Sequence, residues 1–141
     1  MRGRSIVCGV DFSSAWARAL KSATAIAKKH GRRLVVLFVE DPLLAAAARA
    51  ARDSRASAIS TTSALERFIM RSIGSRGTSR AHPAVAIGSP AEEILKVAKR
   101  QHADLVVLGT RGLGRAARLL LGSTTDAVLR HARLRVLAVP S

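Results

Sequence analysis

The stretch DLVVLGTRGLGRAARLLLGST, residues 104–124, carries the most information about the fold and function of this chain. An apolar run ends at Gly109, Gly112 follows, and Gly122-Ser123 closes the segment just ahead of a new helix. Glycine has no Cβ, so its backbone can adopt positive φ and approach a ligand closely. The unpaired N–H groups and the dipole of the next helix would stabilise an anion. The stretch therefore predicts a phosphate-binding loop and, with it, nucleotide binding.

Strand-like and helix-like segments alternate on both sides of this loop. Short apolar runs predict strands at residues 6–10, 34–39, 84–87, 105–108 and 135–139. Amphipathic spacing and capping residues predict four helices. The first begins after Ser13 or Ser14 and ends at Gly31, and the second covers residues 63–74. The third follows the capping box at 89–92, and the fourth begins at an N-cap, Ser123. The order predicts a single doubly wound, three-layer α/β domain over residues 1–141 with a five-stranded parallel sheet.

The region between residues 43 and 79 is harder to assign. Residues 43–57 would form either an extra helix or a mobile basic segment. The sequence SALE at 63–66 predicts a capping box that begins the 63–74 helix, with its buried stripe at Leu65, Phe68, Ile69 and Ile73. Residues 74–79 predict a polar turn.

In sheets of this kind, ligands bind beyond the carboxyl ends of the strands, near the point where the strand order reverses. The predicted strands end at Asp11, Val39-Glu40, Gly88 and Gly109. The glycine loop therefore lies where this fold would place a ligand.

The composition favours a cytoplasmic protein. Of 141 residues, 48% are hydrophobic and 3% aromatic, so the core must be built from Ala, Val, Leu and Ile. The single cysteine, Cys8, cannot form an intramolecular disulfide, and its apolar run favours a buried structural thiol over a reactive one. No apolar stretch approaches the ~20 residues of a membrane span. The basic N-terminus precedes an apolar run too short for a secretory signal, so we expect no membrane association.

The net charge of +15 is high for a chain of this size. A general bias of the proteome towards basic residues, attraction of nucleotide phosphates, and nucleic-acid binding would each account for it. The near absence of aromatic side chains that stack on bases argues against nucleic acid as the partner.

The spacing Gly109-x2-Gly112-x9-Gly122-Ser123 resembles the G-2x-G-9x-G-(S/T) signature of ATP-binding universal stress proteins. Further segments resemble the same family: GVDFSSAWARAL at 9–20, GSPAEEILKVAKRQHADLVVLGTRG at 88–112 and LLLGSTTDAVLRHARLRVLAVP at 119–140. The likeness covers most of the chain and is weakest over 43–82.

This resemblance implies a small Rossmann-like α/β domain, usually a homodimer that pairs through its C-terminal strand and binds ATP with its Mg²⁺. By position, ribose and phosphates would be contacted by Gly109, Gly112, Gly122, Ser123 and Thr124. Asp11 would lie beside the adenosine, and Val39 would meet adenine through its backbone. Arg111 is either a solvated surface residue or a further phosphate contact.

Other interpretations stay open at several of these positions. Gly109 and Gly112 would also serve as turn glycines, and Asp11 would also cap the first helix. The sequence shows no lysine of a GxxxxGK[ST] loop, no Ser-His-Asp or Cys-His array and no metal-ligand spacing. We therefore assign no catalytic residue and no metal site beyond the Mg²⁺ of the nucleotide.

We expect an ATP-dependent stress-response regulator or sensor with at most slow hydrolysis. ATP would shift the equilibrium between two conformations of the protein, and a second subunit or a protein partner of unknown identity would recognise the changed surface. The alternatives are a dimeric interaction module of the same family that binds no nucleotide, and a weak ATPase. We also expect the double substitution Gly109→Val, Gly112→Val to abolish ATP binding and leave the fold intact.

Overall fold

The computed structural model describes residues 4–51, 54–78, 80–110 and 122–140. The elements follow the order β1 (Ser5–Val10), α1 (Ser14–His30), β2 (Arg33–Glu40), α2 (Pro42–Ala51), α3 (Ser54–Thr78), β3 (Ala81–Ile87), α4 (Pro90–Arg100), β4 (Ala103–Gly109), α5 (Ser123–His131) and β5 (Arg135–Val139). The strands form one five-stranded sheet in the order β3-β2-β1-β4-β5, with all neighbouring pairs parallel. The predicted α/β fold with a five-stranded parallel sheet is therefore confirmed.

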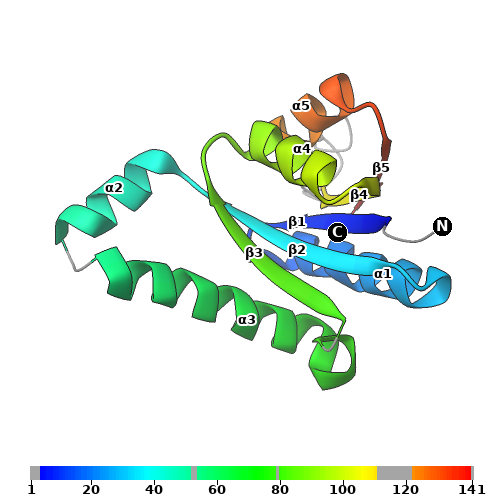
Figure 1. Ribbon diagram of the computed structural model, residues 1–141, viewed down its shortest axis with the longest axis horizontal. Coiled ribbons are helices and arrows are strands. Elements are labelled where there is room, and N and C mark those ends of the chain that lie inside the picture. Colours follow the sequence, from blue (N-terminus) through cyan, green and yellow to red (C-terminus); the bar gives the residue numbers. More distant parts are fainter. Residues whose placement is uncertain (1–3, 52–53, 79, 111–121, 141) are drawn as a thin grey trace.

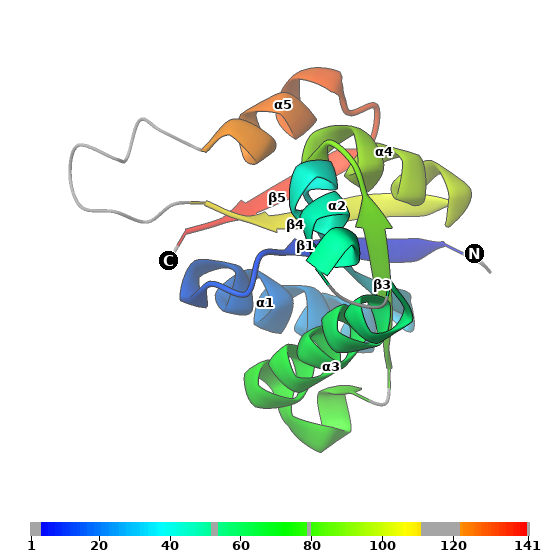
Figure 2. The same cartoon turned by 90° about the vertical axis from the view of Figure 1, so that its left-hand side faces the viewer.

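Helices cover both faces of this sheet (Figure 1). Figure 2 shows α4 and α5 on one side of the sheet, and α1 and α3 on the other. Successive strand residues point to opposite faces, so each strand contributes to two cores. Ile6 and Cys8 of β1 pack with α1 and α3, whereas Val7 between them packs with α4 and α5. This explains why the apolar runs are continuous rather than alternating.

The local signals around α1 match the structure closely. Ser13 is the N-cap, and its hydroxyl accepts a hydrogen bond from the N–H of Trp16 at 3.4 Å. At the other end, Gly31 adopts the left-handed conformation with φ of 61°. Lys28, Lys29 and His30 fill the last turn, where cations interact favourably with the helix dipole.

The region left open between residues 43 and 57 contains two helices. Asp41 starts α2, because its Oδ1 accepts hydrogen bonds from the N–H groups of Leu43 at 2.7 Å and Leu44 at 3.3 Å. The second helix, α3, begins at Ser54, so the predicted capping box at 63–66 is wrong and Ser63 lies inside the helix. The buried stripe of that helix is confirmed at Leu65, Phe68 and Ile69.

The end of α3 combines helix and break. The predicted polar turn at 74–79 is wrong, because α3 continues to Thr78. Gly74 nevertheless interrupts the helical geometry with φ of 70° and ψ of 180°. A residue without a Cβ is suited to such a kink.

The chain moves outwards from β1 to β2 and β3, then returns to the other side of β1 for β4 and β5. The order of the strands therefore reverses between β1 and β4, and the carboxyl ends of the strands meet at one edge. No helix in the described parts of the chain is long and apolar enough to cross a membrane.

Candidate functional site

A cavity of about 90 Å³ lies at the carboxyl ends of β1 and β2. Five elements contribute to its walls, namely β1, β2 and the first turns of α1, α4 and α5. Its lining includes Asp11, Trp16, Phe38, Val39, Pro90 and Thr124. This is the edge of the sheet at which a doubly wound fold binds ligands.

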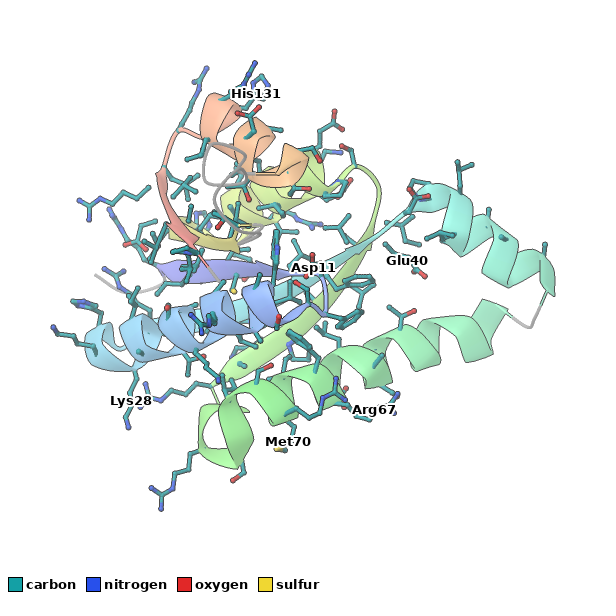
Figure 3. All side chains as sticks on the ribbon, turned by 180° about the vertical axis from the view of Figure 1, so that it is seen from behind. Asp11, Lys28, Glu40, Arg67, Met70 and His131 are labelled. Carbon is teal, nitrogen blue, oxygen red and sulfur yellow. The ribbon has the colours of Figure 1, made fainter. Side chains whose placement is uncertain are left out.

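Asp11 follows β1 directly and is exposed (Figure 3). Its Oδ1 accepts hydrogen bonds from the N–H of Ser13 at 2.9 Å and from the hydroxyl of Ser13 at 2.5 Å. The cap of α1 is Ser13, so Asp11 supports the turn before the helix rather than capping it. Within the described chain, no hydrogen bond to Oδ2 of Asp11 is formed. One carboxylate oxygen is thus available as an acceptor at the cavity.

Val39 lies next to the end of β2 and is half-buried. The pairing of β2 with β1 ends at Phe38, whose partner is Val10. On its other side, β2 continues to pair with β3 as far as Glu40 and Ile87. Val39 therefore has no partner on β1, and the cavity opens at this gap in the ladder.

Gly109 ends β4 and lies against the indole of Trp16. A Cβ at Gly109 would come within 2.7 Å of Cδ1 and 2.8 Å of Cγ of Trp16. A Cβ at Gly9, on β1, would come within 3.0 Å of Cζ3 of the same ring. Trp16 is 8% exposed, and its indole covers the ends of the paired strands β1 and β4, where the strand order reverses. The contacts of Trp16 with Gly9 and Gly109 were not predicted, because they join residues that are far apart in the sequence.

The start of α5 presents backbone donors that have no partner among the described residues. Gly122 is the N-cap, with φ of 80° and ψ of 152°, so the prediction of Ser123 as the N-cap is wrong by one residue. In the part of the chain that the structure describes, no side chain caps this helix, and the first hydrogen bond of the helix runs from the N–H of Asp126 to the carbonyl of Gly122. The amides of Ser123 and Thr124 precede that bond and have no acceptor within the helix. Their hydroxyls are likewise not used for capping.

Thr125 connects this helix to the end of β4. It is 1% exposed, and its Oγ1 donates a hydrogen bond of 2.9 Å to the carbonyl of Gly109. The N–H of Thr110 donates to the carbonyl of Val139 on β5 at 3.0 Å. These two bonds fix the points where the predicted loop leaves β4 and enters α5.

Six of the predicted binding residues can be placed. Asp11, Val39 and Thr124 line the cavity, whereas Gly109, Gly122 and Ser123 are not part of its described lining. The other two, Arg111 and Gly112, lie outside the described residues. The structure thus brings together residues from β1, β2 and α5 that are far apart in sequence.

Other reactive groups lie away from this cavity. Burial raises the pKa of the Cys8 thiol, which is 0% exposed in the core between the sheet and α1. A thiol of this kind is a poor nucleophile, because the thiolate is the reactive form. In the residues that the structure describes, no group of three His, Cys, Asp or Glu side chains could hold a metal ion.

Comparison with family models matches residues 3–140 to the universal stress protein family. A universal stress protein of Thermus aquaticus is 32% identical over 148 residues, which cover 96% of this chain and 98% of the relative. A second one, from Methanocaldococcus jannaschii, is 28% identical over 96% of this chain and 81% of the relative.

Solved structures give the same likeness. The universal stress protein UspA from Lactobacillus plantarum has a TM-score of 0.70 at 28% identity, covering 99% of both chains. A universal stress protein in complex with cAMP has a TM-score of 0.69 at 23% identity, covering 97% of this chain and 96% of its own. One from Archaeoglobus fulgidus in complex with dAMP has a TM-score of 0.67 at 19% identity, covering 99% of both. At such identities the last two show a shared fold.

Proposed function

The chain belongs to the universal stress protein family, and we propose that it binds ATP with Mg²⁺ at the carboxyl edge of its sheet. The observation that carries this proposal is that three binding features lie around one cavity. These are the unused carboxylate oxygen of Asp11, the end of β2 at Val39, which has no partner on β1, and the start of α5 at Thr124. An acceptor, a backbone edge and a helix N-terminus suit a ribose, a base and a phosphate respectively.

The roles of the residues follow from this placement. Val39 would meet adenine through its backbone, and Oδ2 of Asp11 would accept from a ribose hydroxyl. The amides and hydroxyls of Ser123 and Thr124, with Gly122 ahead of them, would face the phosphates. Gly109, Arg111 and Gly112 complete the proposed set by their resemblance to the family signature.

The nucleotide complexes of relatives support this proposal. One structural relative was solved with cAMP and another with dAMP, so the shared fold accommodates adenine nucleotides. The net charge of +15 would attract a polyanionic ligand to this chain at long range. ATP is proposed as the nucleotide because the spacing Gly109-x2-Gly112-x9-Gly122-Ser123 resembles the signature of ATP-binding members of the family.

The biological role that we propose is regulation. ATP would order the segments around the cavity, and a second subunit or a protein partner would detect the changed surface. Hydrolysis would be slow, because no lysine of a Walker motif is present in the sequence. A homodimer is proposed through the edge of β5, which pairs with β4 on one side only among the described strands. Such pairing would cover an open sheet edge.

One observation favours the alternative of an interaction module that binds no nucleotide. The contact with Trp16 accounts for glycine at position 109 without any ligand. That contact does not account for two further features: the amides at the start of α5 and Oδ2 of Asp11 have no hydrogen-bond partner among the described residues. We therefore keep nucleotide binding as the proposed function.

Analysis of the purified protein tests this proposal. Protein isolated without added nucleotide is denatured, and the released small molecules are identified by mass spectrometry. We expect an adenine nucleotide, and calorimetric titration of stripped protein with ATP and Mg²⁺ should show saturable binding. Absence of both results would overturn the proposal, and rapid phosphate release would favour the weak ATPase instead.

A further inference from the structure

A second cavity lies at the opposite edge of the sheet, where the strands begin. Its volume is about 200 Å³, and its lining includes Ile6, His30, Arg32, Asp104, Leu105 and Arg135. Ile6, Leu105 and Arg135 are register partners across β1, β4 and β5, so their side chains share one face of the sheet. That face is the one covered by α1, whose residues Ile26 and His30 form the other wall.

Arg32 is held in this cavity by a carboxylate. Its Nη2 lies 3.1 Å from Oδ2 of Asp104, with the two side chains 25% and 28% exposed. Its other terminal nitrogen, Nη1, is buried and has no hydrogen-bond partner within the described chain. Buried polar groups are normally paired, because an unsatisfied donor loses its hydration without compensation. The guanidinium is thus oriented by Asp104 but lacks one acceptor.

The surroundings of this cavity are strongly basic. Arg135 also lines it, and no carboxylate in the described chain forms an ion pair with Arg135 or His30. The helix ends and strand starts at the same edge add exposed cations, among them Lys28, Lys29, Arg33, Arg80, Arg100 and Arg133. Figure 3 shows Lys28 at the end of α1 that lies away from Asp11. Asp104 is the carboxylate at this edge among the described residues.

We propose that this cavity is a second ligand site, which binds the phosphate group of a small molecule through Arg32 and Arg135. A guanidinium presents paired N–H groups that match phosphate oxygens. Because Asp104 is paired with Arg32, the remaining positive charge comes from Arg135 and the exposed cations at the same edge. The volume of about 200 Å³ has room for a phosphate with a short substituent. The apolar wall of Ile6 and Leu105 would contact the substituent.

The structural alternatives explain only part of this arrangement. The ion pair with Asp104 accounts for one face of Arg32, but not for its buried Nη1. An exposed arginine such as Arg135 also discourages unwanted pairing at the edge strand β5. A test must therefore separate a role in binding from a role at the sheet edge.

Titration with inorganic phosphate, followed by NMR, provides this test. The protein is kept at constant ionic strength, and a second series uses ethyl phosphate to compare a free phosphate with a phosphate ester. We expect saturable shifts of the backbone amides of Arg32, Leu105 and Arg135 in at least one series. The same shifts should occur with ATP and Mg²⁺ saturating the other edge of the sheet, which makes the result independent of the proposed function.

Three variants decide the assignment. Arg135→Gln affects an exposed residue, so we expect it to fold normally and to weaken phosphate binding at least tenfold; Arg32→Gln should do the same. Arg133→Gln removes an equal charge from a residue that lines a different cavity, and should change binding less than twofold. Absence of saturable shifts in both series, or equal losses in all three variants, would overturn the proposal.

Discussion

The indole of Trp16 lies so close to Gly109 that a Cβ there would approach Cδ1 within 2.7 Å. This contact alters what the double substitution Gly109→Val, Gly112→Val reports. A valine at position 109 would collide with a ring that is 8% exposed and packed against the sheet. Loss of ATP binding in that variant would therefore combine loop effects with damage to the core.

The first prediction follows directly. Gly109→Val should lower the free energy of unfolding by about 1–3 kcal/mol, the usual cost of forcing extra atoms into a packed core. Urea denaturation without nucleotide measures this. Combining the substitution with Trp16→Leu should recover part of the loss, because the smaller side chain vacates space. Unchanged stability of Gly109→Val would contradict the packing argument.

Asp11 gives a cleaner test of the binding site. In Asp11→Asn the amide oxygen can retain the two hydrogen bonds from Ser13, while an N–H₂ group replaces the free oxygen. Stability should change by no more than about 0.5 kcal/mol, and ATP should bind about tenfold more weakly, since a charge-assisted bond is lost. Calorimetry checks the affinity.

Asp41→Asn is the matched control for this variant. Asp41 starts α2 through its Oδ1 and lies outside the described lining of the cavity. Asparagine is an equally good cap, and the change in net charge is the same. ATP affinity should stay within about twofold. If both variants weaken binding equally, overall charge rather than contact at Asp11 explains the loss.

Substitutions at two glycines with positive φ distinguish an effect on protein stability from an effect on ATP binding. Gly122 has φ of 80° ahead of α5, and Gly31 has φ of 61° at the end of α1. Substitution of either by alanine should cost about 1–3 kcal/mol, because Gly31 lies in the left-handed helical region and Gly122 in an extended region with positive φ, and a Cβ is strained in both. Gly122→Ala should also weaken ATP binding by displacing the amides of α5, whereas Gly31→Ala should leave it unchanged. Equal affinities of the two variants would contradict the assigned role of α5.

Phe12 adopts a conformation that is rare for a bulky residue, with φ of 68°. Its ring stacks on Phe38, with 4.4 Å between centroids, and meets Phe68 edge to face at 5.4 Å. Both Phe12→Ala and Phe12→Gly remove these contacts, but glycine also relieves the backbone strain. Phe12→Gly should therefore be more stable than Phe12→Ala by about 1 kcal/mol, the reverse of the usual order. Thermal or urea unfolding decides between the two orders.

The proposed dimer can be tested at Ala138. The carbonyl of Val139 accepts from Thr110, so Val139 faces β4, and the neighbouring residue faces the open edge. Ala138→Pro would remove an outward N–H group without breaking the pairing with β4. Sedimentation velocity should show a dimer for the unmodified protein and a shift to monomer for Ala138→Pro. A dimer of unchanged strength would place the interface elsewhere.

Strands were predictable because this sheet is buried on both faces. Residues such as Leu34 to Leu37 form unbroken apolar runs that a helix or loop would rarely carry. Local rules also sufficed at Ser13 and Gly31, where one residue decides the geometry of a helix end. The error at Ser63 arose because a capping pattern inside a long helix has no local feature to mark it as unused.

Contacts between residues far apart in the chain could not be predicted from the sequence. Nothing near Gly109 in the chain indicates that Trp16 occupies its neighbourhood, because the pairing depends on the topology of β1 and β4. The ion pair between Arg32 and Asp104 likewise joins residues that meet only once the sheet has formed. The candidate residues at strand ends were predictable from the fold class, whereas their hydrogen bonds were not.

Chemical-shift mapping of ATP and Mg²⁺ on the isotope-labelled, nucleotide-free protein tests the central claim most directly. We predict saturable shifts of the backbone amides of Asp11, Val39, Ser123 and Thr124, with Gly31 at the opposite edge unaffected. Binding that leaves these carboxyl-edge amides unchanged, or no binding at all, would contradict the account.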